Sequence, residues 1–154
     1  MIVIDELLKG FTKIKKLFSK NVPSSISPSD YLLLTTIENE GTFDESYGQK
    51  IINVSKLAEK LEMSKPALAK ETKRLEKQGF IKKTTLLHNL RNRYILLTPK
   101  GLEKIITEHD NIYKLPTLVL DKLGEEESKK FVDMLNKIND IIIESNKKGR
   151  IVWL

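Results

Sequence analysis

The sequence contains no cysteine among its 154 residues. Disulfide bonds, thiolate zinc sites and peroxide sensing by a thiol are therefore excluded. The seven glycines are scattered singly, and none forms a phosphate-binding loop. Only two histidines are present, His88 and His109, and neither belongs to a cluster with the spacing of metal ligands. We therefore expect a protein that binds no metal and no cofactor and that is not an enzyme.

Long hydrophobic runs are also missing. No apolar run approaches the roughly 18 residues that a membrane-spanning helix needs. The first apolar stretch contains Asp5 and Glu6, whereas a signal peptide starts basic and continues without acidic residues. We therefore expect a cytoplasmic protein without a membrane partner. Hydrophobic residues make up 40% and charged residues 31% of the chain, a balance that is typical of globular proteins.

Positive charge is concentrated in one part of the chain. The net charge is +6, and residues 53–100 contain twelve Lys and Arg but only four Glu. Basic and acidic residues nearly balance in the remainder, so the whole positive excess lies in this stretch. Charge gathered in this way attracts a polyanion such as nucleic acid. A lysine-rich solvated surface is the alternative that charge alone leaves open.

Apolar residues at helical spacing predict helices on both sides of the basic stretch and within it. Ser27 or Asp30 is expected to cap the second helix, Ser55 to begin the third, and Thr98 to cap the fifth. Residues 41–52 are expected to form a loop, with a short strand at 51–54. The predicted helices cover residues 3–19, 31–40, 55–63, 65–78, 99–115 and a segment that starts at 125.

The last two predicted helices carry long apolar faces. Phe131, Leu135, Ile138 and Ile142 follow a 4-3-4 spacing, which is typical of a helix that packs on another helix. The acidic triplet at 125–127 favours a helix start through the macrodipole. The fifth helix is expected to end at Pro116, with His109 partly buried on its apolar face. That face is expected to contain Leu102, Ile105, Ile106, His109, Ile112 and Tyr113.

The third and fourth helices are separated only by a turn at 62–64. This spacing is typical of a helix-turn-helix, in which the second helix enters the DNA major groove. If Leu68 and Leu75 point inward, the opposite face is basic, with small residues at its edges. Such a face suits contacts to phosphates, guanine edges and thymine methyl groups, although a solvated surface helix is the alternative. The outward residues are Pro66, Lys70, Lys73, Arg74 and Lys77, flanked by Ala67 and Ala69.

A basic β-hairpin is predicted directly after the helix-turn-helix. Residues 80–87 and 93–97 are rich in β-branched and aromatic side chains, and the polar segment HNLRN separates them. Lys82 and Lys83 lie on the first strand. Arg91 and Arg93 lie near the tip, where an arginine can enter the minor groove. An ordinary turn with solvated arginines is the alternative.

These motifs resemble those of MarR-type regulators. The segment VSKLAEKLEMSKPALAKETKRLEKQGFI resembles their helix-turn-helix, NLRNRYILLT resembles their wing signature and returning strand, and LDKLGEEESKKFVDMLNKI resembles the start of their last helix. The resemblance covers essentially the whole chain. It implies a mainly α fold with a small β-hairpin wing, in which a winged helix-turn-helix core (28–100) stands between N-terminal (1–27) and C-terminal (101–154) dimerisation helices.

The resemblance also implies a function. MarR-type regulators act as homodimers on pseudo-palindromic operators in double-stranded DNA, often as repressors that a small aromatic effector releases. Asn89 stands where the family usually has a wing aspartate, and Glu71 at a commonly apolar position. A winged-helix module that binds protein is the alternative function, but the lysines of the fourth helix disfavour it. The predicted DNA-binding residues are Ser64, Lys65, Pro66, Ala67, Lys70, Lys73, Arg74, Lys77, Lys82, Arg91 and Arg93.

Overall fold

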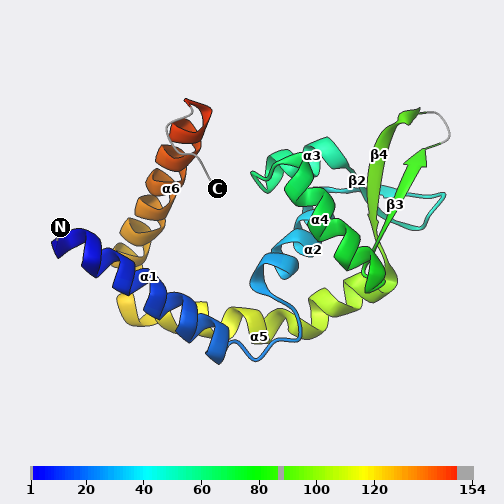
Figure 1. Ribbon diagram of the computed structural model, residues 1–154. Coiled ribbons are helices and arrows are strands. Elements are labelled where there is room, and N and C mark those ends of the chain that lie inside the picture. Colours follow the sequence, from blue (N-terminus) through cyan, green and yellow to red (C-terminus); the bar gives the residue numbers. More distant parts are fainter. Residues whose placement is uncertain (1, 87–88, 149–154) are drawn as a thin grey trace. The chain divides into compact units, whose positions relative to one another are not determined.

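The computed structural model describes residues 2–86 and 89–148. His88, expected near the wing tip, and residues 149–154 lie outside the described residues. The fold is mainly helical with a small sheet, and it confirms the predicted winged helix-turn-helix class (Figure 1). The elements are α1 (Ile2–Asn21), α2 (Pro28–Glu40), β1 (Thr42–Asp44), β2 (Gln49–Asn53), α3 (Val54–Lys60), α4 (Lys65–Lys77), β3 (Ile81–Leu86), β4 (Asn89–Leu97), α5 (Pro99–Leu123) and α6 (Glu125–Lys147).

The chain divides into two compact units. The first runs up to Tyr113 and contains α1, the winged helix and the first part of α5. The second starts at Lys114 and contains the end of α5 together with α6. Among the described residues, no helix is long and apolar enough to cross a membrane.

The four strands form one antiparallel sheet in the order β1-β2-β4-β3. The short strand predicted at 51–54 is confirmed in part by β2, but the loop predicted before it was wrong, because β1 and the start of β2 form a hairpin there. The side chain of Asp44 accepts the backbone N–H groups of Ser46 and Tyr47, which closes the turn. Gly48 then adopts a φ of 65°, a left-handed conformation that glycine reaches without strain.

The hydrophobic core lies between helices α2, α3, α4 and the sheet. Leu34 and Ile37 of α2, Leu57 of α3 and Leu75 of α4 have no solvent-exposed surface. Burying each such side chain contributes roughly 1.5–3 kcal/mol relative to leaving it in water. This core fixes α4 against the rest of the winged helix. It includes Ile26, Tyr31, Leu33, Leu34, Ile37, Ile52, Leu57, Ala58, Leu68, Leu75, Phe80, Ile81, Ile95, Leu97 and Ile112.

Helix α3 begins one residue earlier than predicted. Its cap is Asn53, whose side-chain oxygen accepts the N–H groups of Ser55 and Lys56, so Ser55 lies inside the helix. For α2, the structure selects Ser27 from the two expected caps, because the Ser27 hydroxyl accepts the backbone N–H of Asp30 at 3.0 Å. The Asp30 side chain is thereby left for a different partner.

Helix α5 packs tightly at its start and continues beyond its predicted end. A Cβ at Gly101 would lie 2.1 Å from the carbonyl oxygen of Phe80, so only glycine fits there. Thr98 caps the helix by accepting the N–H of Gly101 at 3.0 Å, as predicted. The predicted end at Pro116 was wrong, since the helix runs on to Leu123. A proline inside a helix removes one backbone donor and disfavours the helix, but α5 continues past Pro116 for seven more residues.

The buried face of α5 is narrower than predicted. Gly101, Glu108 and Ile112 are buried, and Ile105 packs on the core, whereas Ile106 is 68% exposed. These four buried or packed positions have the spacing i, i+4, i+7 and i+11, which is one narrow side of a helix. The predicted apolar face was wider and included residues that are exposed. His109 was expected to be partly buried but is exposed. Its ring instead stacks on Tyr113, with centroids 4.5 Å apart.

Candidate nucleic-acid interface

The turn between α3 and α4 sets the direction of α4. Leu61 and Met63 donate their N–H groups to the carbonyls of Leu57 and Ala58, which completes the last turn of α3. Glu62 then adopts a φ of 53°, in the left-handed region that is uncommon for a residue other than glycine. Helix α4 starts three residues later. This tight reversal is the predicted helix-turn-helix.

Helix α4 is held by its start and by one apolar side. The Ser64 hydroxyl accepts the N–H of Ala67 at 3.2 Å, and Pro66 lies in the first turn, where its missing donor costs no helical bond. Leu68, Thr72 and Leu75 are buried. The Thr72 hydroxyl donates to the carbonyl of Leu68 at 2.8 Å, so this polar group is satisfied inside the core.

The opposite side of α4 is basic and open to solvent, as the helical wheel predicts. None of its lysines forms an ion pair within the part of the chain that the structure describes. We call these residues the α4 basic face. Its exposed members are Lys65, Pro66, Ala67, Lys70, Lys73 and Lys77.

Arg74 differs from these lysines because its guanidinium contacts α2. Nη1 and Nη2 donate to the two carboxylate oxygens of Asp30 at 3.0 and 2.5 Å, and Nη2 also donates to Glu71 at 2.5 Å. The hydrogen bonds to Asp30, and then those to Glu71, raise the pKa of Arg74. Arg74 remains a predicted DNA contact, but in the structure it fastens α4 to α2. The helical wheel could not reveal Asp30, which lies 44 residues away.

The wing places its basic residues on two faces. Side chains alternate along a strand, and residues paired across two strands share a face. Lys83 pairs with Ile95, and Thr85 with Arg93, so Lys83 and Arg93 share one face. Lys82 lies on the opposite face. The predicted set of DNA-binding residues included Lys82 but omitted Lys83. Lys83 lies two residues after the buried Ile81, so the two side chains share a face of the strand.

A basic hollow lies between α4 and this face of the wing. Its volume is about 190 Å³, and its walls combine cationic side chains with an apolar floor. The structure thus brings together Lys65 and Arg93, two predicted residues that are 28 positions apart, and adds Lys83. The hollow is lined by Val54, Lys65, Leu68, Ala69, Thr72, Lys83, Arg93 and Ile95.

Arg91 lies in strand β4 and not in the predicted turn. The prediction gave 88–92 to the turn, whereas β4 starts at Asn89. The ladder is irregular here, because Thr85 pairs with Arg93 while Leu86 pairs with Asn89. Arg91 falls inside this irregular segment and is exposed.

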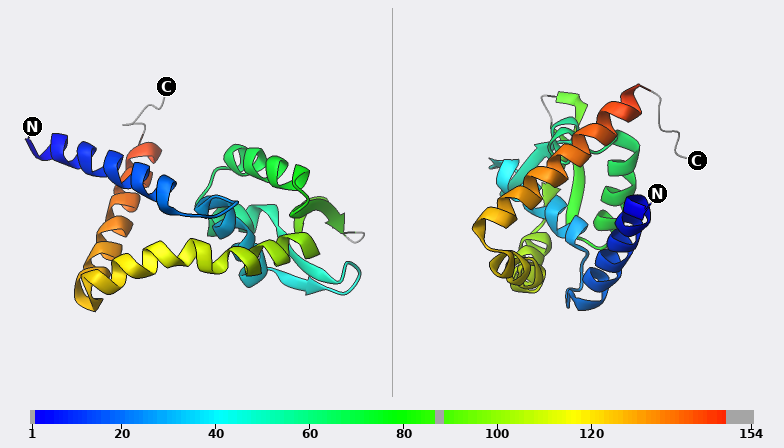
Figure 2. Two further views of the ribbon diagram at one scale, coloured as in Figure 1. Left: turned by 90° about the horizontal axis from the view of Figure 1, so that it is seen from below. Right: turned by 90° about the vertical axis from the view of Figure 1, so that its left-hand side faces the viewer.

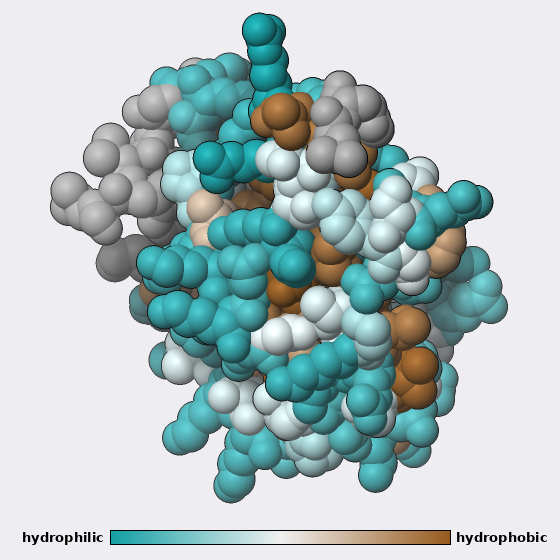
Figure 3. Space-filling view, turned by 90° about the vertical axis from the view of Figure 1, so that its right-hand side faces the viewer, coloured by the Kyte–Doolittle hydropathy of each residue, from teal (hydrophilic) through white to brown (hydrophobic). Residues whose placement is uncertain are grey.

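The views of the winged helix agree on this arrangement. In Figures 1 and 2 the end of α4 lies next to the start of β3, and the two elements are in contact. Figure 3 shows hydrophilic side chains over most of the face from which the wing projects, with smaller hydrophobic areas between them. The α4 basic face, the hollow and the wing together form a candidate surface for a polyanion.

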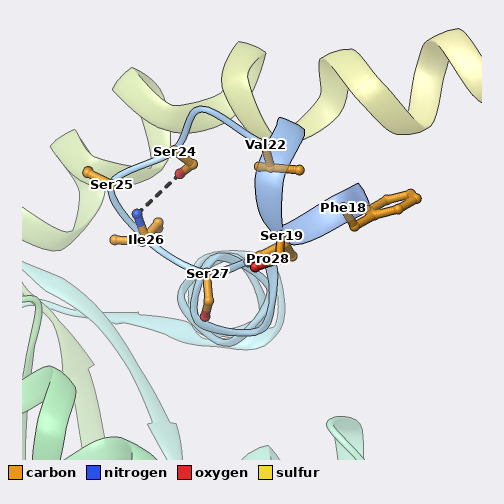
Figure 4. A pocket seen from close by; sticks show the side chains of 8 residues that line it. All are labelled: Phe18, Ser19, Val22, Ser24, Ser25, Ile26, Ser27 and Pro28. Atoms are coloured by element: carbon orange, nitrogen blue, oxygen red, sulfur yellow. Dashed lines mark hydrogen bonds between the residues drawn. The ribbon is translucent and has the colours of Figure 1, made fainter. Parts of the chain in front are cut away.

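A separate cavity of about 440 Å³ lies at the connection between α1 and α2 (Figure 4). The hydroxyls of Ser24 and Ser25 donate to the carboxylate of Glu108 at 2.8 and 2.6 Å. These bonds, that of Ser25 first, outweigh burial and lower the pKa of Glu108 to about 2. Glu108 could not be found from the sequence, because its two serine partners lie more than 80 residues away. The lining residues are Phe18, Ser19, Val22, Ser24, Ser25, Ile26, Ser27 and Pro28.

Comparison with known proteins identifies the class of this domain. The sequence model of the MarR family matches residues 26–92, which span α2, the helix-turn-helix and the start of the wing's second strand. Residues 26–92 therefore match the MarR family, as the resemblance predicted. No curated protein matches the sequence.

Solved structures share the fold over most of the chain. Sco3205, a MarR family transcriptional regulator from Streptomyces coelicolor in complex with DNA, is 16% identical, with 91% of this chain and 88% of that chain covered and a TM-score of 0.71. A mutant MarR from E. coli complexed with operator DNA is 18% identical (89% and 94% covered, TM-score 0.68). BpsR from Bordetella bronchiseptica, whose DNA binding is regulated by 6-hydroxynicotinic acid, is 14% identical (90% and 99% covered, TM-score 0.67).

Proposed function

We propose that this protein is a transcriptional regulator that binds specific sites in double-stranded DNA as a homodimer. The observation that carries the proposal is the α4 basic face, which is open to solvent and continues into the hollow with Lys83 and Arg93. Cations arranged in this way along a helix and a wing fit the phosphates on both sides of a groove. A module that binds protein needs large outward apolar residues on α4, whereas the exposed apolar residues of this helix are only Pro66, Ala67 and Ala69.

A second copy of the chain is the partner that the terminal helices require. Leu7, Leu8 and Phe11 of α1 are each about half exposed, and so are Phe131 and Leu135 of α6. Apolar faces of this length are costly in water and are buried in dimers of helical proteins. Two recognition helices related by twofold symmetry read half-sites one helical turn apart, so the operator is a pseudo-palindrome. We propose repression, because a dimer bound over a promoter would block access of the polymerase.

The protein is mixed with fragmented genomic DNA, and sequencing of the fragments that it retains identifies the operator. A gel shift then gives the dissociation constant of the complex between protein and operator. Affinity should fall steeply with salt, because phosphate contacts release counterions. Lys73→Ala should weaken binding and lower the salt slope by about one. Lys129→Ala removes an equal charge from α6, where Lys129 pairs with Glu125, and should leave both quantities unchanged. Binding that does not depend on salt would contradict the proposal.

The wing has its own test. Arg91→Ala should weaken operator binding by about 1–3 kcal/mol if the arginine contacts a base, and the loss should depend on the sequence at one operator position. Lys129→Ala on α6 again serves as the charge control. Equal affinities of wild type and Arg91→Ala would remove Arg91 from the interface.

We further propose that a small aromatic effector occupies the cavity at the α1–α2 connection. Its lining combines four serines with apolar side chains, which suits a ring that carries hydroxyl groups. An effector acts only if it binds the free and the DNA-bound conformations with different affinity. Phenol and catechol should raise the melting temperature and weaken DNA binding, and Ser25→Ala should reduce both effects. No shift with either compound would argue for constitutive DNA binding.

A further inference from the structure

Strand β3 lies at the edge of the sheet, with β4 on one side only. An edge strand leaves every second backbone N–H without a ladder partner. The regular pairing of β3 with β4 also ends at Thr85, before the irregular step to Leu86. Contacts that β3 makes outside its ladder with β4 therefore help to hold the wing.

Helix α4 supplies the first such contact. The backbone N–H of Lys83 donates to the carboxylate of Glu76 at 2.7 Å. Glu76 is one of only four acidic residues in the basic stretch, and an anion in this position opposes the approach of phosphates. The hydrogen bond explains why an acidic residue stands here, because its carboxylate accepts a charge-assisted bond from the edge of the wing.

The β1–β2 hairpin supplies the second contact, on the other face of the sheet. The hydroxyl of Tyr47 lies 2.7 Å from that of Thr84 and donates to the carbonyl of Thr85 at 3.4 Å. Thr84 alternates with Lys83 along β3, so its side chain lies on the face opposite the hollow. Tyr47 belongs to the turn of the segment 41–52, and Figure 1 shows this turn beside β3.

We propose that Glu76 and Tyr47 are positioning residues that together hold the wing at a fixed distance from α4. Lys65, Lys83 and Arg93 share one small hollow, and their mutual repulsion pushes the wing away from α4. Glu76 opposes this repulsion from the α4 side, and Tyr47 blocks rotation of the wing from the far face. The β1–β2 hairpin is thus part of the DNA-reading apparatus. The inference rests on the proposed function.

A double-mutant cycle measures the coupling between Tyr47 and the wing residue Arg91. Tyr47→Phe removes only the hydroxyl and should weaken operator binding about 2–10-fold, the net worth of one hydrogen bond. In the Tyr47→Phe background, Arg91→Ala should cost clearly less than in wild type, because the wing is already misplaced. Tyr113→Phe removes an exposed hydroxyl on α5 and should change neither quantity. Additive effects of Tyr47→Phe and Arg91→Ala would overturn the proposal.

Hydrogen exchange reads the same contacts without DNA. The Lys83 amide should exchange at least several-fold faster in Glu76→Ala than in wild type, because its acceptor is gone. Circular dichroism and the melting temperature of each variant verify that the domain stays folded. Unchanged exchange at Lys83 would overturn the role of Glu76. If wild type binds no DNA, the proposed function fails, whereas the exchange measurement still decides whether the contact holds the wing.

Discussion

The winged helix and the two terminal helices use apolar residues in opposite ways. Within α2, α3, α4 and the sheet, large apolar side chains such as Leu34, Leu57 and Leu75 have no exposed surface. In α6, by contrast, none of the described side chains is buried, and Met134 and Ile141 are more than half exposed. Helix α1 resembles α6, since Val3 and Ile4 are mostly exposed. One region buries its large apolar side chains within a single chain, and the other leaves them exposed.

This difference separates the information for folding from that for assembly. The core of the winged helix is satisfied by contacts inside one chain, so this domain is expected to keep its structure in a monomer. Burying the apolar faces of α1 and α6 would contribute about 25 cal/mol of free energy for each Å² removed from water. Substitutions in the two regions should therefore produce different kinds of defect, and four predictions follow this contrast.

The largest effect is expected from a charge placed on the apolar face of α6. Leu135→Asp should weaken dimerisation at least about 100-fold, because an unpaired carboxylate in an apolar interface costs several kcal/mol. Sedimentation velocity should then show a monomer at micromolar concentration. Circular dichroism should show that the winged helix stays folded.

Asn136→Asp provides the matched control, with the same new charge at a polar, exposed position of α6. It should remain dimeric. A dimeric Leu135→Asp protein would show that α6 does not form the interface, and the contrast between the two regions would lose its explanation.

The second prediction concerns the buried region. Leu75→Ala should lower the free energy of unfolding by about 2–5 kcal/mol, because it leaves a cavity in a core with no exposed surface at this position. The loss should be the same at every protein concentration. Leu135→Ala should instead give a melting temperature that recovers as concentration rises, as linkage to dimerisation requires. Thermal melts at three concentrations distinguish the two cases, and the same concentration dependence for both variants would contradict the contrast.

The sequence predicted local structure well and tertiary contacts poorly. The start of α4 was readable because Ser64 and Pro66 act within one helical turn, and Leu68 and Leu75 repeat at a fixed spacing. The pairing of Arg74 with Asp30 was not readable, because it depends on how α2 and α4 cross. Arg74 therefore looked like one more outward cation of the α4 basic face.

The same reason explains the missed hairpin and the misplaced face of α5. Strand β1 has only three residues, too few for a period-two pattern, and its identity depends on pairing with β2. On α5, Ile106 and Tyr113 are apolar but exposed within one chain. A pattern of apolar residues shows that a face is to be buried, but not whether the same chain or a partner buries it.

The third prediction concerns Glu108, which fastens the α1–α2 connection to α5 inside the first unit. Its pKa in the folded protein is about 2, below the ordinary value of 4.5, so ionised Glu108 stabilises the fold above pH 4.5. This contribution is lost as pH falls from 4.5 to about 2. Glu108→Gln should therefore lose at most about 3.5 kcal/mol of stability at pH 7, since one pKa unit corresponds to about 1.4 kcal/mol.

The measurement is urea unfolding of wild type and Glu108→Gln between pH 7 and pH 2. The two stabilities should converge as pH falls below 4.5, the ordinary pKa of a glutamate. Glu103→Gln, an exposed neighbour on α5, should show a much smaller difference at every pH. A difference between wild type and Glu108→Gln that stays constant down to pH 2 would show that shape, and not the charge of Glu108, holds the connection.

The smallest effect is expected at Gly10, in the middle of α1. A Cβ added there meets no other atom of the chain within 4 Å, unlike one at Gly101. Gly10→Ala should thus raise the free energy of unfolding by about 0.5–1 kcal/mol through helix propensity alone. Thermal melts and sedimentation together test this. Lower stability with weaker dimerisation would mean that the partner's backbone approaches α1 at Gly10, which would place the interface on that side of the helix.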